Sequence, residues 1–301
     1  MDDTELLEQL SGVMGKLVDR HLATAKEWFP HELVPWSLGE DFARGESVEG
    51  SALPDGVRSA LIVNLLTEDN LPYYFNDLDR MYSRDEAWSS WVRRWTAEEG
   101  RHSIVIRDYL TVTRLVDPRA LERARMAQVS GGVVPHPPSA VDGFAYIALQ
   151  ELATRVSHHN TGKALADQAG YEVMKRVAAD ENLHHLFYRD LVSASLEVDP
   201  SGTLEAIERQ VTDFEMPGTG IPDFARHARA IAREGIYNLT VHYESVVVPL
   251  VIRAWGLERI SGLSARAEQA RERVLAHVKR LQRVALRSQE RSPRTRGSSA
   301  S

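Results

Sequence analysis

The 301-residue sequence contains no cysteine. Disulfides, thiolate nucleophiles, zinc–cysteine sites and cysteine-ligated iron–sulfur clusters are therefore excluded within this chain. Any metal would have to be held by Glu, Asp and His, and oxygen-rich ligand sets of this kind favour iron or manganese.

Long apolar runs are missing as well. No stretch of about 18 apolar residues is present, so we expect no membrane span. The acidic start, Met1 to Glu5, lacks the cationic and apolar regions of a signal peptide, which predicts a cytoplasmic protein. The net charge of −7 argues weakly against nucleic acid as a partner, although an acidic chain can still carry a local basic patch.

Helical periodicity dominates the chain, and no section is rich in strand signals. Helices are expected near residues 4–27, 57–81, 85–116, 119–128, 141–166, 170–196, 203–214, 223–255 and 263–287. Pro72 is expected to kink the helix at 57–81, because it removes a backbone donor. We predict a single all-α domain over residues 1–287, a mobile Gly/Pro-rich loop at 130–140, and a disordered polar tail at 288–301.

The sequence Glu-x-x-His occurs twice, at Glu99–His102 and at Glu181–His184. Positions i and i+3 lie on the same face of a helix, so the carboxylate and the imidazole can reach one metal ion. One such motif can arise by chance. A second regularity makes the pair informative: Glu68 precedes Glu99 by 31 residues, and Glu151 precedes Glu181 by 30.

This spacing predicts two helical hairpins. Roughly 15 residues along one helix and 15 back along the next return the chain to the same height, at about 1.5 Å per residue. Each hairpin then offers two glutamates and a histidine, and the two facing hairpins form a four-helix bundle. Its centre has the ligand set of ferritin-like carboxylate-bridged di-iron or di-manganese proteins. The predicted ligands are Glu68, Glu99, His102, Glu151, Glu181 and His184.

The surroundings of these six residues favour a buried site over solvated surface pairs. Trp88, Trp91 and Trp95 share one helical stripe with Glu99 and His102, at spacings of 3 and 4. Four glutamates also balance the charge of two divalent cations, which lowers the cost of burying them together.

Four blocks of the chain resemble the signature blocks of the soluble acyl-[acyl-carrier-protein] desaturases of plant plastids and actinobacteria. These blocks are Thr67–Pro72, Trp95–His102, Gln150–Thr161 and Ala179–His184. The resemblance covers roughly residues 15–260, and it is strongest to the actinobacterial branch of this stearoyl-ACP desaturase-like family.

The resemblance implies roles for individual residues. Glu68, Glu99 and His102 would bind one iron; Glu151, Glu181 and His184 would bind the other; Glu99 and Glu181 would bridge them. Thr154 matches a hydroxyl beside the oxygen-binding position, although a helical Thr can equally bond back to a carbonyl. Trp28 and Asp180 match a proposed electron-transfer relay to the His184 side of the cluster, with a packed aromatic and an orienting carboxylate as the structural alternatives.

The resemblance also implies the reaction and the partners. Two iron ions would activate O2 and introduce a cis double bond into an acyl chain carried on acyl carrier protein. Electrons would come from a ferredoxin, itself reduced through a ferredoxin reductase and NADPH, and the chain would form a homodimer. Arg226, Arg229 and Arg233 are candidates for a basic surface that receives the acidic carrier, although an ordinary solvated helix face explains them as well.

Two positions depart from the family pattern. Gly100 stands where Asn is common, and His185 stands where plant members commonly have Glu; His185 is interpreted as a surface or outer-sphere histidine. These changes bear on redox tuning and on the outcome of the reaction, not on iron binding. Separately, the sequence leaves alternatives to a desaturase open. The alternatives are a di-iron hydroxylase or oxygenase acting on a carrier-bound acyl intermediate, a non-catalytic ferritin-like iron-binding protein, and a catalytically silent relative.

Overall fold

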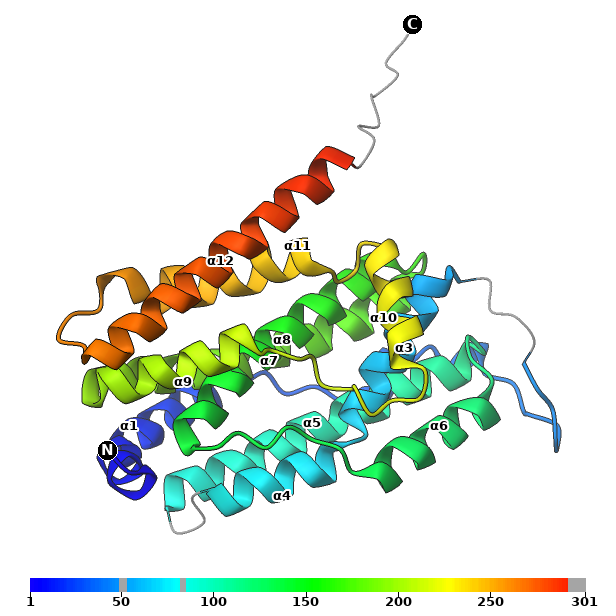
Figure 1. Cartoon of the computed structure of the whole chain (residues 1–301). Coiled ribbons are helices and arrows are strands. Elements are labelled where there is room, and N and C mark those ends of the chain that lie inside the picture. The colour runs from blue at the N-terminus through cyan, green and yellow to red at the C-terminus, as the bar shows by residue number, and fades with distance from the viewer. Residues whose placement is uncertain (49–52, 82–84, 292–301) are drawn as a thin grey trace, which may run out of the picture.

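The computed structural model describes residues 1–48, 53–81 and 85–291, and these residues form helices without any strand. The centre of the molecule is a bundle of two hairpins (Figure 1). Their helices are α3 (Asp55–Glu68), α5 (Glu86–Val112), α7 (Ala140–Ala164) and α8 (Gln168–Val198). The predicted all-α four-helix architecture is confirmed.

The other helices surround this bundle. α1 lies across α5 and α8, α10 lies beside α3, and α12 packs along α9 (Figure 1). Their bounds are α1 (Asp3–Thr24), α2 (Pro30–Leu33), η1 (Trp36–Leu38), α4 (Leu71–Met81), α6 (Pro118–Gly131), α9 (Pro200–Thr212), α10 (Phe224–Arg233), α11 (Leu239–His242), the π-helix η2 (Tyr243–Ala254), η3 (Leu257–Arg259) and α12 (Ala265–Arg291). No helix in the described part of the chain has the length and apolar character needed to span a membrane.

Short polar side chains start three of the four bundle helices. Asp85 accepts a hydrogen bond from the amide of Trp88 (2.7 Å), and Ser139 and Asp167 act in the same way at the starts of α7 and α8. Each bond satisfies one of the amides that a helix N-terminus leaves free. These caps fix where these three helices begin and therefore at what height their predicted ligands lie.

The core consists of two apolar clusters with a polar layer between them. On α5, Trp88 and Trp91 belong to one cluster, and Val105 and Ile106 belong to the other. Along α8 the two clusters follow one another in the opposite order, since Val173, near the start of this helix, belongs to the second cluster. The chain between the two clusters carries Glu-x-x-His in both helices. Apolar packing on either side therefore brings the polar residues of the four helices to the same level.

The structure changes two of the expected helices. The helix predicted at 57–81 is broken rather than kinked: α3 ends at Glu68 and α4 begins at Leu71. Pro72 has no amide hydrogen to donate to the carbonyl oxygen of Glu68, so the helical hydrogen bond is missing there. Next to Glu68, the carboxylate of Asp69 forms an ion pair with Arg107 (2.6 Å). The segment at 223–255 is also divided, because Gly235, with φ of +79°, follows the end of α10.

Two predicted boundaries shift as well. Part of the predicted loop at 130–140 belongs to α6, which ends at Gly131. The remaining loop contacts the body, since Asn70 donates a hydrogen bond to the carbonyl of Val133 (3.0 Å); its mobility stays a prediction. The predicted tail at 288–301 begins within α12, which continues to Arg291, and its other residues lie outside the described ones.

Candidate metal centre

The six predicted ligands lie together in the middle of the bundle, and all of them are buried. They form two overlapping groups in which the ligand atoms lie within 4.8 Å of one another. One group consists of Glu68, Glu99, His102 and Glu181, and the other consists of Glu99, Glu151, Glu181 and His184. Because Glu99 and Glu181 belong to both groups, they occupy the positions from which a carboxylate could bridge two ions.

Both imidazoles point their Nδ1 atoms into this centre. Nδ1 of His102 lies 3.4 Å from Glu99 and 3.3 Å from Glu181. Nδ1 of His184 lies 2.8 Å from Glu99 and 3.7 Å from Glu151. Neither nitrogen makes an aligned hydrogen bond to a described residue. Two buried imidazole nitrogens without such a bond, surrounded by carboxylates, fit a pair of cations better than they fit a hydrogen-bonded polar core.

The electrostatics of the centre favour the same interpretation. Burial and the charge of Glu181 raise the pKa of Glu99 to about 7, and the same two causes raise the pKa of Glu151. Burial alone would lower the pKa of His102 and His184, but the surrounding carboxylates hold both well above the ordinary range. Without cations, these side chains retain protons to offset the crowded charge. Divalent ions would displace those protons.

We expect the metal-free protein to lose stability as the pH rises from about 5 to about 8. A raised pKa in the folded state means that the fold holds protons the unfolded chain releases. That contribution is complete below the ordinary glutamate pKa of 4.5 and is lost as the pH rises through about 7, the pKa of Glu99. Thermal unfolding across this range, with and without bound metal, tests the expectation. Identical slopes in the two states would contradict it.

Thr154 lies beside the candidate centre, and its role at the oxygen-binding position stays a prediction. Its hydroxyl is 2.8 Å from Glu181, and it is also 3.1 Å from the carbonyl oxygens of Gln150 and Glu151. The hydroxyl has one hydrogen to donate among these three acceptors. Contact with a predicted ligand and back-bonding to the helix are therefore both available at this residue.

Trp28 and Asp180 are in contact, but they lead to a different histidine from the one predicted. Nε1 of Trp28 donates a hydrogen bond to Oδ2 of Asp180 (2.7 Å), and that oxygen lies 3.6 Å from Nε2 of His102. The prediction that this pair serves the His184 side is wrong. Asp180 shares α8 with His184, but its carboxylate faces α5, where His102 lies.

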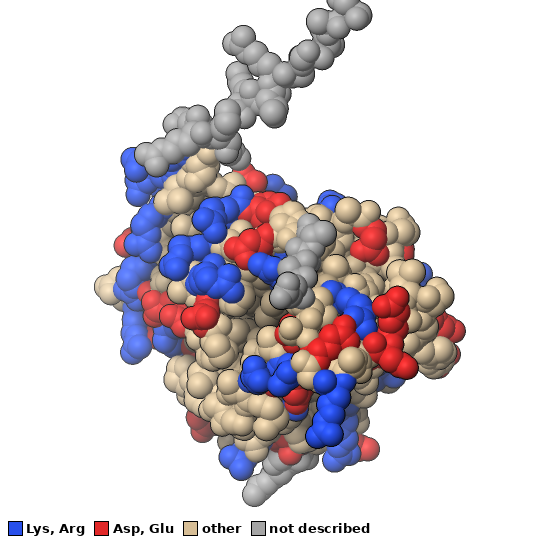
Figure 2. Space-filling model, turned by 90° about the vertical axis from the view of Figure 1, so that its right-hand side faces the viewer, with Lys and Arg blue, Asp and Glu red and all other residues tan. Residues whose placement is uncertain are grey.

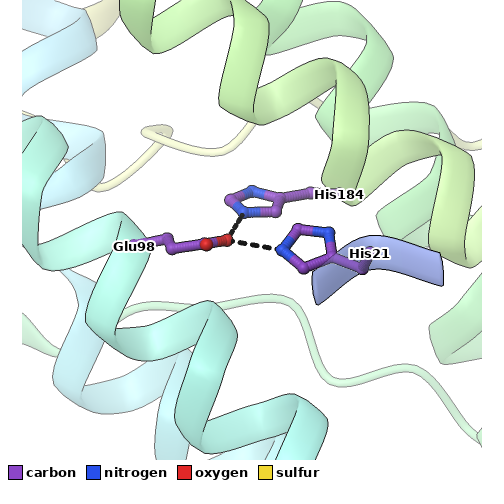
Figure 3. A group of neighbouring side chains, drawn as sticks. All are labelled: His21, Glu98 and His184. Atoms are coloured by element: carbon purple, nitrogen blue, oxygen red, sulfur yellow. Dashed lines mark hydrogen bonds and ion pairs between the residues drawn. The ribbon is translucent and has the colours of Figure 1, made fainter. Parts of the chain in front are cut away.

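Three residues near the centre were not predicted as site residues. Glu98 contacts His184 and His21 through one carboxylate oxygen (Figure 3), and His158 lies 3.1 Å from Glu68. The sequence does carry a signal for Glu98, because an acidic residue precedes the glutamate in both Glu-x-x-His motifs. His21 continues the apolar stripe of α1, but nothing in the sequence places α1 against the bundle.

The two departures from the family pattern lie outside the ligand groups. A Cβ atom at Gly100 would meet no other atom within 4 Å, so packing does not require glycine there. His185 is buried rather than on the surface, and its Nδ1 is 2.8 Å from the carbonyl oxygen of Ala148. Burial lowers the pKa of His185 to about 4, so this side chain is neutral at physiological pH.

Three neighbouring cavities share wall residues beside the centre. The outer cavity lies between α10, α11 and α12, and it shares Met216, Ala228 and Tyr237 with a middle cavity. The middle cavity shares Thr67, Glu68 and Pro217 with an inner, mostly apolar cavity between α4, α7 and the loop that follows α6. Glu68 therefore belongs both to the ligand cluster and to the walls of the middle and inner cavities. We refer to this row of three cavities as the passage.

Comparisons with known proteins agree with this geometry. A family model described as fatty acid desaturase matches residues 2–301. The Mycobacterium tuberculosis H37Rv protein DesA1, which bears the name of an acyl-[acyl-carrier-protein] desaturase, is 38% identical over 294 residues, covering 94% of this chain and 87% of the relative. The chloroplastic stearoyl-[acyl-carrier-protein] 9-desaturase 6 of Arabidopsis thaliana is 34% identical over 285 residues, covering 88% and 72%.

A solved structure is similar as well. The X-ray structure of DesA2 from Mycobacterium tuberculosis H37Rv, whose title describes an acyl-ACP desaturase, superposes with a TM-score of 0.72 at 28% identity. The match covers 88% of this chain and 99% of the other.

Proposed function

Because this chain belongs to the fatty acid desaturase family, we propose that it is an O2-dependent di-iron enzyme that introduces a cis double bond into an acyl chain carried on acyl carrier protein. One observation carries the proposal: Glu68 lies in the ligand cluster and also lines the apolar passage. An extended acyl chain in that passage would lie against the proposed metal centre.

The residues of the passage bind, orient and shield the substrate. Leu78, Met81 and Ile147 give the inner cavity apolar walls that fit an alkyl chain. Such walls exclude water from the centre, which protects a strong oxidant from side reactions. Thr154 places a hydroxyl in the wall of the middle cavity, where it also contacts Glu181.

Bound iron would supply the chemistry that no side chain has, namely activation of O2 for removal of two hydrogens from adjacent CH2 groups. Overall, the acyl chain gives up two electrons and two protons, an external donor gives two more electrons, two protons come from solvent, and O2 is reduced to two waters. With no cysteine, the chain has no iron–sulfur cluster of its own. We therefore assign electron delivery to a ferredoxin with its reductase.

The carrier protein would dock where the outer cavity opens. Figure 2 shows Lys and Arg side chains gathered on one side of the face that includes α10 and the end of α12. Arg226, Arg229 and Arg233 are exposed on α10, and Arg280, Arg283 and Arg287 are exposed on α12. An acidic carrier would be drawn to this face. We further propose a homodimer formed through the long helices, as the family resemblance implies.

Mass spectrometry of the acyl product tests the proposed reaction. Protein reconstituted with iron, ferredoxin, reductase and a panel of acyl carrier protein substrates should release acyl chains about 2 Da lighter than the substrate. A product about 16 Da heavier would instead support the hydroxylase alternative. O2 consumption that does not depend on acyl substrate would support a ferritin-like role. Failure to retain iron after anaerobic loading would support a catalytically silent relative.

A further inference from the structure

Two similar chains of side-chain contacts run outward from the candidate metal centre, and each ends at a residue of the N-terminal segment. We call each of these chains an arm. In one arm, Trp28 donates a hydrogen bond to Asp180, which lies beside His102. In the other, Nε2 of His21 donates to Oε2 of Glu98 (2.9 Å), and Nε2 of His184 donates to the same oxygen (3.0 Å). Figure 3 shows this carboxylate of α5 between the imidazoles of α1 and α8.

The outer ring of each arm also stacks on the histidine of the centre. The Trp28 and His102 rings are 6.5 Å apart with an interplanar angle of 14°, and the His21 and His184 rings are 5.8 Å apart with an angle of 26°. In both arms the middle carboxylate immediately precedes a glutamate shared by the two ligand groups. His21 therefore occupies, beside His184 of the α7–α8 hairpin, the position that Trp28 occupies beside His102 of the α3–α5 hairpin.

His21 is set on the apolar face of α1. Leu10, Met14, Leu17 and His21 follow one another at spacings of 4, 3 and 4 and are all buried. An imidazole without a partner on such a face would oppose the docking of α1, because burial costs a polar group its hydration. Glu98 supplies the partner. Glu98 is in turn held by Arg94, which donates a hydrogen bond to its other oxygen (2.6 Å).

The orientation of Glu98 matters for His184. Nδ1 of His184 faces the centre, so when it binds a metal ion the ring's one remaining proton lies on Nε2, and an acceptor at Nε2 fixes both the tautomer and the ring orientation. Glu98 is that acceptor. Its position is fixed from one side by Arg94 and from the other by His21 of α1.

We propose that docking of α1 and metal binding in the bundle are coupled through His21, which acts as a positioning residue for Glu98 and His184. This proposal rests on the metal site proposed above. Coupling is reciprocal by thermodynamic necessity: if docked α1 strengthens metal binding, bound metal must strengthen the docking of α1. The first helix is then a working part of the site, although it supplies none of the six ligands.

The test compares His21→Leu, which removes the donor, with His21→Gln, which keeps an N–H donor. Competition titration with Co2+ or Fe2+ should show about 10- to 100-fold weaker binding for His21→Leu, with His21→Gln in between. In the unaltered protein, metal should slow amide hydrogen exchange throughout α1. In His21→Leu, this metal-dependent slowing should disappear.

Leu17→Ala serves as the matched control, because it weakens apolar contacts of α1 and leaves the His21–Glu98 bond in place. It should lower the melting temperature but retain the metal-dependent slowing. The coupling would be overturned if His21→Leu kept the metal affinity of the unaltered protein and also kept the metal-dependent slowing of amide exchange in α1. This holds even if the protein bound two metal ions and desaturated its substrate. Three ions per chain would also overturn it, because His21 and Glu98 would then be ligands of the third ion, together with Nε2 of His184, rather than positioning residues. Failure of the unaltered protein to bind metal would overturn the proposed function as well.

Discussion

Replacing Glu151 with alanine is expected to remove one of two bound metal ions and to lower turnover by more than about 100-fold. Glu151 belongs to one ligand group only, together with His184 and the two shared glutamates. Its carboxylate is buried, and Oε2 makes no hydrogen bond among the described residues. Metal analysis and single-turnover assays of the variant test this expectation.

The size of the effect follows from the position of the residue. Loss of a group that merely orients a ligand commonly costs about 10- to 100-fold, so loss of a ligand should cost more. Reaction with O2 should suffer most, since both metal ions would contribute to it. The opposite glutamate, Glu68, offers the equivalent test for the other ligand group.

Glu197 on α8 provides the control for the Glu151 variant. Its side chain is exposed, and Glu197→Ala should retain metal content and turnover. If Glu151→Ala behaved like Glu197→Ala, the interpretation of the 30-residue repeat as paired metal-binding hairpins would be wrong.

Replacing Ile147 with tryptophan is expected to block the passage without disturbing the metal centre. Ile147 lies on α7 one turn before Glu151 and lines the inner cavity with Leu78 and Met81. The larger ring would occupy space that the far end of an acyl chain needs. Loss of room for even one methylene is worth about 10-fold or more in kcat/KM, so long substrates should be affected by at least that factor.

Substrate length separates blockage from general damage. If the carrier protein docks where the outer cavity opens, as we propose, the acyl chain enters from the α10–α12 side. Short acyl chains should then lose less activity than long ones, while metal content stays unchanged. Ile104→Trp, at an exposed position on α5, is the control and should affect neither. An equal loss for all chain lengths would count against the inner cavity as the site of the chain end.

Much of the candidate centre could be predicted from the sequence because the six predicted ligands obey local rules. Glu99 and His102 face the same way because of helical periodicity, and the 30-residue spacing follows from the length of a helical hairpin. Pro72 signalled a disturbance after Glu68. The ion pair between Asp69 and Arg107 at this break joins residues that are distant in the sequence, so helical periodicity could not predict it.

The contacts around the ligands were harder to predict because they join segments far apart in the chain. Asp180 is four residues from His184 but contacts His102, 78 positions away. His21 and Glu98 meet only because α1 packs across α5 and α8. Sequence periodicity shows which face of a helix is buried, but it does not show which neighbour that face meets.

Anomalous diffraction from crystals of the iron-loaded protein tests the central claim most directly. The account predicts two iron peaks per chain: one beside Glu68 and His102, and one beside Glu151 and His184, with Glu99 and Glu181 reaching both. A single ion held by His21, Glu98 and His184, or no ion among the six predicted ligands, would contradict it.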